Sequence, residues 1–560
     1  MASRLAEKSM TPFRMLLDLF RARFFENDLL SPEGGFEGSI YQVLGVLATP
    51  GAFVSYYTMP SLLELAARPP GPAVDWALRL YRLFFPAYSF AVVGFATVFE
   101  WDMLFPDRRD FLVLGSFPIR VRTLFAAKFA ALGLFLLMLI GAVNGSMTIA
   151  VPLLSLDIPQ LRQAGFLRLL AAQIAAAGGA SAFAFFAVAG FQGVLINVSS
   201  PRIFRRVSPW IQVAGMSLMI LALLLYPVYS LLLPAAALAH SSWLWFFPPV
   251  WFIGIYDVLL PHSDPLFASL GMFGLKALGT AAALFCLAWG LGFRRHYRRT
   301  LETEDTESRK PRRSLFDRFM ASEEERAIFR FTGRILARSA RHRLFLATYW
   351  SVGIAIGLLT TVAVRNGRVG ASPDGLRSFP LLIAFFMVSG YRAAFQFPAE
   401  LGSNWLFRIT EERWAETSRR ATRKRVIASG LVPALLVLLP FEMTWWGGIF
   451  GLFHAAFQLA TGALLIEILF WSFDKVPFTC SYFPGKVNLA LLSGLFLYGF
   501  TTYSFQMADL EAALEGHPGR VVLFFVSAGG LLAVCWRRRR AASEVRFDAH
   551  EPEIQTLDLT

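Results

Sequence analysis

The chain alternates between long apolar blocks and short charged segments. The apolar blocks are about 20 residues long, the length that crosses the hydrocarbon core of a bilayer as one helix. This pattern predicts an all-α polytopic membrane protein with twelve spanning helices, six in each half of the chain. The predicted spans lie near residues 39–60, 81–99, 123–143, 167–195, 209–233, 268–293, 344–364, 379–396, 426–441, 447–471, 487–505 and 520–536.

A predicted amphipathic helix precedes each half. In the first helix, five apolar side chains share one side and three charged ones share the other: Phe13, Leu16, Leu17, Phe20 and Phe24 against Arg14, Asp18 and Arg21. In the second helix, four arginines lie opposite three apolar residues: Arg330, Arg334, Arg338 and Arg341 against Ile328, Phe331 and Ile335. This pattern is typical of helices that lie in the plane of the membrane interface. A plain basic flank of the following span is the alternative.

These elements divide the chain into five parts. We expect a cytoplasmic amphipathic segment (1–38), a first six-helix half (39–293), a basic linker (294–343), a second six-helix half (344–536) and a polar tail (537–560). Between the fifth and sixth spans, the apolar segment 234–267 contains Pro248, Pro249 and clustered tryptophans. We expect it to be a re-entrant or an interfacial element on the outer side. Its counterpart in the second half, residues 506–519, reads as a short acidic loop.

A charged, proline-broken segment follows the second span of each half. Residues 100–122 carry Pro106 and Pro118 between two apolar blocks, so this segment cannot lie in hydrocarbon. Residues 397–425 occupy the same place in the second half. The pair Phe397-Pro398 aligns with Phe105-Pro106, and Arg425 stands at the foot of the next span as Lys128 does. The common order of elements predicts an internal repeat.

The first charged segment resembles the permeases of ABC-2-type transporters. The resemblance lies in FPDRRD, the following LGSFPI, the Arg-x-Arg pair and the lysine at the foot of the next helix. In that family, the loop between the second and third helices forms a coupling helix that docks on a cytoplasmic ATPase. A basic turn at the lipid headgroups is the alternative. The resemblance implies coupling residues at Glu100, Asp107, Arg108, Arg109 and Asp110, and in the second half at Glu400 and Arg408.

The composition excludes a soluble protein, and the placement of the basic residues predicts the orientation of the chain in the membrane. Of the 560 residues, 56% are hydrophobic and only 16% are charged. The net charge of +14 does not indicate nucleic-acid binding, because the basic residues lie in loops between apolar blocks. Segment 234–267 has no Lys or Arg, whereas the linker and Arg537 to Arg540 are basic. The positive-inside rule then predicts that both termini are cytoplasmic.

The sequence carries no catalytic, cofactor or metal motif. Gly485-Lys486 superficially resembles a P-loop, but Val487 stands where Ser or Thr would hold magnesium. The three cysteines are far apart and show no metal-ligand spacing. We therefore expect a transporter subunit rather than an enzyme. ATP and Mg²⁺ would bind to a separate ATPase, in two copies.

Polar residues inside one predicted span are candidates for a substrate path. His454, Gln458 and Thr461 recur at helical spacing in the tenth span, and Glu467 lies nearly two turns further on. Hydrogen bonding between helices that only fixes their packing is the alternative.

Three classes of function fit these observations. The first is the permease subunit of an ABC exporter in the bacterial cytoplasmic (inner) membrane, within the lipid bilayer and without nucleic-acid partners. The second is a secondary transporter of the major-facilitator kind, although residues 100–122 lack that family's Gly-x-x-x-Asp-Arg-x-Gly-Arg-Arg pattern. The third is a lipid-linked membrane enzyme, although the predicted outer loop 61–80 holds only Glu64 and Asp75 as acidic residues. The sequence does not indicate the substrate.

Overall fold

The chain folds into two compact units, residues 1–307 and 308–560. The division falls within the predicted linker 294–343. Each unit is described by itself, from a computed structural model. The structure describes residues 11–25, 49–51, 53–64, 67–69, 71–105, 114, 117, 119–261, 264–302, 319–365, 368–371, 373–399, 414–473, 475–479 and 489–538.

The protein is an all-α, multi-pass membrane protein. Nine helices in the described part of the chain are long and apolar enough to cross a bilayer. They are Pro72–Phe99, Arg122–Ser155, Phe166–Val198, Arg206–Leu224, Pro265–Leu291, Ala340–Thr361, Glu416–Trp446, Gly448–Leu469 and Pro518–Cys535. The first predicted span, 39–60, is described only from residue 49, where the chain is helical. Twelve spans remain a prediction.

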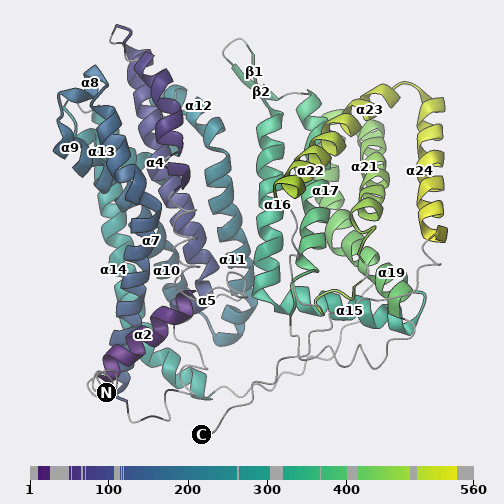
Figure 1. Cartoon of the computed structure of the whole chain (residues 1–560), viewed down its shortest axis with the longest axis horizontal. Helices are drawn as coiled ribbons and strands as arrows, with labels where there is room; N and C mark the ends of the chain where they lie inside the picture. Colours follow the sequence, from purple (N-terminus) through teal and green to yellow (C-terminus); the bar gives the residue numbers. More distant parts are fainter. Residues whose placement is uncertain are drawn as a thin grey trace. The chain divides into compact units, whose positions relative to one another are not determined.

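Unit 1 is built around one central helix, α4 (Pro72–Phe99), which packs against α7, α10, α11 and α13 (Figure 1). Its buried side chains include Leu83 and Phe85, which belong to the unit's two apolar clusters. The elements around it are α2 (Pro12–Phe25), α5 (Trp101–Leu104), α7 (Val121–Ser155), α8 (Pro159–Arg162), α9 (Phe166–Gln173), the π-helical turn η2 (Ile174–Gly178), α10 (Gly179–Val198), α11 (Pro201–Leu224), α12 (Tyr226–Leu238), the 3₁₀ turn η3 (Ser242–Phe246), α13 (Pro248–Val258) and α14 (Pro265–Glu302).

The short helix α13 is buried inside unit 1. Every residue from Pro249 to Asp257 is buried. Two prolines can begin this helix because its first N–H groups have no partner within the helix. A Cβ atom on Gly254 would lie only 2.3 Å from the carbonyl oxygen of Phe267 on α14, so glycine alone permits this approach. Whether this segment is re-entrant or interfacial in the membrane stays a prediction.

Two predicted elements, the fifth span and the loop 506–519, differ from the structure. The fifth span was expected as one helix over 209–233, but the helix breaks at Leu225 and α12 begins at Tyr226. The break lies beside Pro227, which has no N–H group to continue the helical hydrogen bonds. The expected loop 506–519 is largely helical, because it continues α22 through a π-helical turn into α23. The buried side chains of Ala508 and Leu514 hold α23 against the unit.

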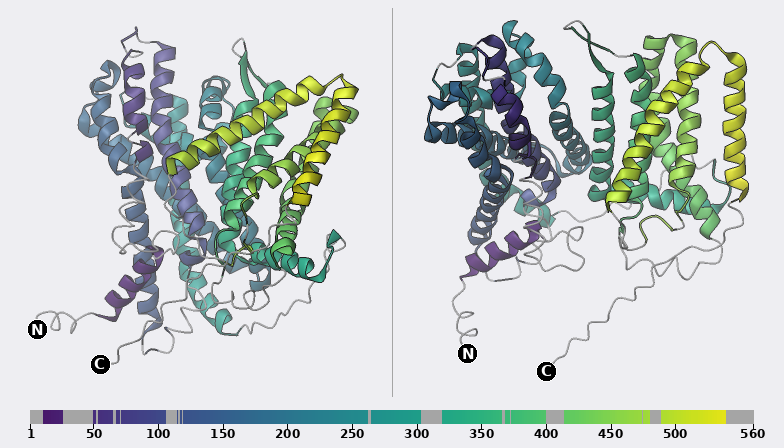
Figure 2. Two further views of the ribbon diagram at one scale, coloured as in Figure 1. Left: turned by 45° about the vertical axis from the view of Figure 1, so that its right-hand side comes forward. Right: turned by 45° about the horizontal axis from the view of Figure 1, so that its top comes forward.

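Unit 2 is centred on α17 (Pro373–Ala394), whose residues are buried without interruption from Pro380 to Tyr391. The predicted span 344–364 ends early, because α16 stops at Thr361 and an antiparallel hairpin follows in which Val362 pairs with Ala371. Helices α22 and α23 run diagonally across the unit (Figure 2). The elements are α15 (Glu323–Arg338), α16 (Ala340–Thr361), β1 (Val362–Arg365), β2 (Arg368–Ala371), α17, α19 (Trp414–Val426), η7 (Ile427–Leu431), α20 (Val432–Trp446), α21 (Gly448–Leu469), α22 (Leu489–Thr501), η8 (Thr502–Gln506), α23 (Met507–Leu514) and α24 (Pro518–Arg538).

Candidate functional site

The first charged segment starts from a firmly anchored helical turn, α5. The indole Nε1 of Trp101 donates to the hydroxyl of Ser208 on α11 at 3.0 Å, and Gln192 on α10 donates to the carbonyl of Trp101 at 2.8 Å. Gln212 on α11 donates to the carboxylate of Asp102 at 3.1 Å. A force on the segment that follows α5 would therefore reach α4, α10 and α11 directly.

Glu100 lies at the junction of α4 and α5, where its carboxyl group is largely withdrawn from water. Burial raises the pKa of Glu100 from its ordinary value of 4.5 to about 7; the neighbouring Asp102 adds to this rise, and Lys128 opposes it. Glu100 is therefore close to half-protonated at neutral pH. The other predicted coupling residues lie outside the described residues: Asp107, Arg108, Arg109, Asp110, Glu400 and Arg408.

Replacing Glu100 by glutamine is expected to flatten the pH dependence of thermal stability. Between pH 4.5 and about 7, folded Glu100 keeps a proton that the unfolded chain releases. The free energy of unfolding of the wild type therefore falls as pH rises through this window, by at most roughly 3 kcal/mol. The variant should be the more stable protein above pH 7. Thermal unfolding in detergent across this range measures the difference, with the exposed Glu64→Gln as the control. Parallel profiles for Glu100→Gln and the wild type would contradict the assignment.

In each unit, a cation at the foot of one spanning helix holds the amphipathic helix. In unit 1, Lys128 of α7 places its ammonium 4.6 Å from the ring centroid of Phe20 on α2. In unit 2, Arg425 of α19 places its guanidinium carbon 3.5 Å from the ring centroid of Phe329 on α15. Lys128 and Arg425 are the two residues that the repeat aligns. Figure 1 shows α2 and α15 each lying across the helix ends at one edge of its own unit.

Further contacts attach α15 to α19. Lys424 Nζ lies 2.6 Å from the carboxylate of Glu325, which also accepts a hydrogen bond from the backbone N–H of Ala321 at 2.9 Å. Ser322 caps the same helix by accepting from the backbone N–H of Glu325. The described end of the second charged segment, Trp414 to Arg425, is thus part of a helix fixed to the amphipathic helix.

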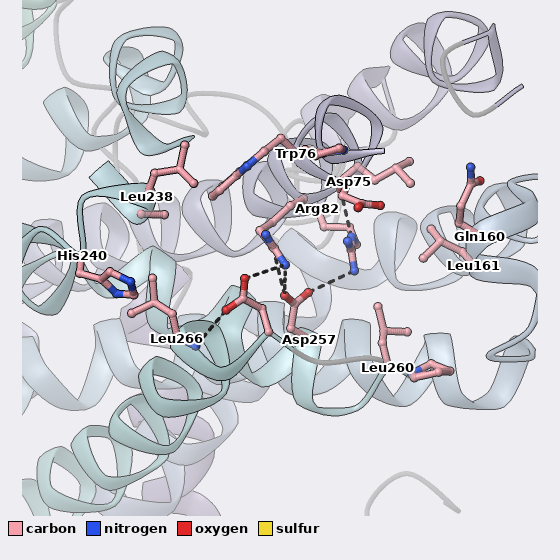
Figure 3. A pocket seen from close by; sticks show the side chains of 16 residues that line it. Asp75, Trp76, Arg82, Gln160, Leu161, Leu238, His240, Asp257, Leu260 and Leu266 are labelled. Atoms are coloured by element: carbon pink, nitrogen blue, oxygen red, sulfur yellow. Dashed lines mark hydrogen bonds and ion pairs between the residues drawn. The ribbon is translucent and has the colours of Figure 1, made fainter. Parts of the chain in front are cut away.

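Unit 1 contains a cavity of about 610 Å³ at the end of α4 that is remote from α5 (Figure 3). Asp257 of α13 lies at its floor and is shared by two arginines of α4. Arg79 Nη2 lies 3.0 Å from one carboxylate oxygen and Arg82 Nη1 lies 3.4 Å from the other. The guanidinium of Arg79 also lies 4.2 Å from the ring centroid of Phe267. These buried ion pairs connect the short buried helix α13 to the central helix α4.

The cavity combines a buried floor, in which Asp257 is paired with Arg79 and Arg82, with acidic groups nearer the solvent. Asp264 lies 3.8 Å from Arg79 and its side chain is 40% exposed, and Asp75 is also exposed. His240, at the rim, has a φ of 47°, a left-handed conformation that ends α12 without a glycine. We did not predict this site from the sequence. A signal was present, because Arg79 and Arg82 are three residues apart on one face of a helix, and the apolar segment 234–267 contains only two acidic residues, Asp257 and Asp264.

In unit 2 the structure keeps His454 and Gln458 of the predicted substrate path together and places Glu467 apart from them. His454 Nδ1 contacts the carboxylate of Glu511 on α23, and Gln458 Nε2 donates to Glu442 on α20 at 2.9 Å. Glu467 lies elsewhere, 3.1 Å from Arg423 of α19. These are contacts between helices, as the packing alternative expects. The substrate-path hypothesis stays a prediction.

Comparisons with protein-family models, with curated proteins and with solved structures found no match. The geometry of these sites therefore carries the functional argument alone. Among the described residues, no group of three or more His, Cys, Asp or Glu is placed to hold a metal ion.

Proposed function

We propose that this chain is the transmembrane permease subunit of an ATP-driven ABC exporter in the bacterial cytoplasmic membrane. Its twelve spans would form two six-helix halves with both termini in the cytoplasm. Segments 100–122 and 397–425 would each engage one copy of a separate cytoplasmic ATPase. The observation that carries the proposal is the contact that the two units share, between Phe20 and Lys128 in unit 1 and between Phe329 and Arg425 in unit 2.

The shared contact matters because of its position. In each unit it ties an amphipathic helix to the foot of the spanning helix that follows the charged segment. A cation over an aromatic ring contributes about 0.5–2 kcal/mol, and the apolar contacts of Phe20 and Phe329, both almost fully buried, add to it. In both units, the charged segment is therefore followed by a spanning helix that is held to the amphipathic helix. A partner that moves this segment would move the spanning helices with it.

In unit 1, contacts at the start of the charged segment 100–122 support the same mechanism. The hydrogen bonds of Trp101 fix α5 to α10 and α11. Closure of an ATPase dimer would thus act on both α4 and α7, the helices on either side of the segment. ATP binding and hydrolysis would take place in the partner chain, and this chain would supply only the mechanical link and the path for the substrate.

Charge reversal in the coupling segments is expected to release the ATPase. Arg108→Glu with Arg109→Glu, and separately Glu400→Arg with Arg408→Glu, should weaken co-purification of the ATPase and lower ATP hydrolysis by the reconstituted complex. Truncating one partner of a buried interfacial charge pair costs roughly 2–5 kcal/mol, whereas charges that face headgroups contribute about 1 kcal/mol or less. Thermal stability of the isolated permease should hardly change.

A matched control reverses two exposed arginines of α11 on the same predicted face, Arg202→Glu with Arg206→Glu. This control changes the net charge as the first pair does and should keep the ATPase bound. Retention of the ATPase by both pairs of coupling variants would show that these segments are basic turns at the lipid headgroups.

A secondary transporter is the second candidate, and one observation favours it. The buried contact between His454 and Glu511 is of the kind that ion-coupled transporters use within the membrane. Substrate movement driven by a proton gradient in vesicles that contain this chain alone would support this candidate. Movement that requires both ATP and the partner ATPase would support the exporter.

A further inference from the structure

Four buried polar side chains gather at one place in unit 2. Glu442 lies on α20, His454 and Gln458 lie on α21, and Glu511 lies on α23; each is at most 6% exposed. One contact joins His454 to Glu511, and one hydrogen bond of 2.9 Å joins Gln458 to Glu442. Three helices therefore direct polar groups into an otherwise apolar bundle. The coupling mechanism proposed above uses none of them.

Each of the four side chains keeps one polar atom without a hydrogen bond to any described residue. These atoms are Oε2 of Glu442, Nε2 of His454, Oε1 of Gln458 and Oε2 of Glu511. Buried polar atoms in proteins are normally hydrogen-bonded, because leaving them unpaired forfeits their interaction with water. A cluster that served helix packing alone would be expected to pair its atoms. Three of the four unpaired atoms, the two carboxylate oxygens and the ring nitrogen, belong to groups that can bind a proton.

The charged groups around the cluster are already paired or exposed. Arg377 of α17 pairs with Glu515, just after α23, at 2.8 Å, and its guanidinium carbon lies 4.9 Å from the ring centroid of Trp446. Asp509 of α23 and Arg520 of α24 are exposed. The charges that remain to be balanced within the cluster are therefore those of its two carboxyl groups and its imidazole.

These charges do not balance unless a proton is bound. Glu511 has a basic group beside it, because it is in contact with the imidazole of His454. Among the described residues, no cation forms an ion pair with Glu442, and its hydrogen bond comes from the neutral amide of Gln458. His454 also acts on Glu442 electrostatically, but its imidazole is in contact with Glu511. A charged carboxylate buried without a counter-charge is strongly unfavourable in a membrane bundle. Glu442 is therefore expected to be neutral.

We propose that Glu442, His454, Gln458 and Glu511 form a proton-binding site, in which Oε2 of Glu442 carries the bound proton at neutral pH. The Gln458 amide holds the other oxygen and so fixes the orientation of the carboxyl group. Release breaks the O–H bond, leaves its electron pair on the carboxylate and passes the proton to water. A proton fits better than a metal ion, because the described carboxyl and imidazole groups do not converge closely enough for metal coordination.

The location of the site suggests where the proton goes. Glu511 and Glu515 follow the eleventh predicted span, and the Glu515 side chain is 33% exposed. In the proposed orientation, this end of unit 2 faces the external medium. The site would therefore respond to external pH, a consequence that rests on the proposed topology. Proton binding itself requires neither that topology nor the ATPase.

Infrared difference spectroscopy of the purified full-length protein in liposomes tests this proposal without any partner. Titration from about pH 5 to about pH 9 covers the ordinary pKa of histidine and extends well above that of glutamate. The titration is run in a Glu100→Gln background, which removes the carboxyl group that is half-protonated near pH 7. We expect this protein to keep the band of one protonated carboxyl group at neutral pH and to lose it only at higher pH. Glu442→Gln should lack that band, and Glu511→Gln should retain it.

Glu323→Gln is the matched control, because Glu323 belongs to the same unit but its side chain is 81% exposed. This variant should leave the band unchanged. Absence of the band from the Glu100→Gln protein at neutral pH would overturn the proposal, even if the further variants failed to fold. Persistence of the band in Glu442→Gln would overturn it as well. Loss of ATPase binding in the coupling variants has no bearing on either outcome.

Discussion

Replacing Gly254 by leucine is expected to destabilise unit 1 by more than about 3 kcal/mol, beyond the usual 1–3 kcal/mol of an overpacked core. Helices α13 and α14 meet here backbone to backbone. A Cβ atom on Gly254 would lie 2.3 Å from the carbonyl oxygen of Phe267 and 2.6 Å from the backbone nitrogen of Gly271. Because backbone atoms cannot rotate away as side chains do, the two helices must separate. Thermal unfolding in detergent and the yield of monodisperse protein measure the loss.

Gly279→Leu on α14 is the matched control. A Cβ atom on Gly279 would have no described atom within 4 Å, so the added side chain has room. Gly254→Ala should fall between the two leucine variants, because it adds the clashing atom without the rest of the side chain. Equal melting temperatures for Gly254→Leu and Gly279→Leu would contradict the close approach of α13 and α14.

Replacing Asp257 by leucine is expected to cost about 3–5 kcal/mol, the usual consequence of removing one partner from a buried ion pair. The change leaves Arg82 buried without its carboxylate, while Arg79 keeps Asp264 at 3.8 Å. Asp75→Asn in the same cavity is the control, because Asp75 is exposed and should contribute little. The measurement is again the thermal unfolding of the purified protein.

Removing the arginines together with the aspartate should restore much of that stability. The triple variant Arg79→Met, Arg82→Met and Asp257→Leu replaces the buried ion network by apolar side chains, a change that is often neutral or stabilising. A triple variant less stable than Asp257→Leu alone would show that the arginines stabilise unit 1 by other contacts, such as that of Arg79 with the Phe267 ring. The restored protein would also show whether transport needs the charges of the cavity.

The features predicted correctly are those that depend on local composition. Long apolar helices follow from the length and hydropathy of each block, so the predicted spans near 81–99 and 447–471 correspond to the helices Pro72–Phe99 and Gly448–Leu469. The amphipathic pattern before each half likewise corresponds to α2 and α15, in which Phe20 and Ile328 are buried. Charged segments that contain prolines interrupt the apolar pattern wherever they occur, so they are recognised from the local sequence. A bilayer imposes these rules on each block separately.

Pairings between distant residues depended on the tertiary structure. Arg79 and Asp257 are 178 residues apart, and only the packing of α13 against α4 brings them together. The periodicity of the tenth span placed His454, Gln458 and Glu467 in one stripe, yet the first two face Glu511 and Glu442 while the third faces Arg423. Side chains on one face of a helix extend over several turns, and different helices pack against the two ends of that face. The sequence by itself determined which segments form long apolar helices. The tertiary structure decided which buried charges neutralise one another, because that depends on which helices pack side by side.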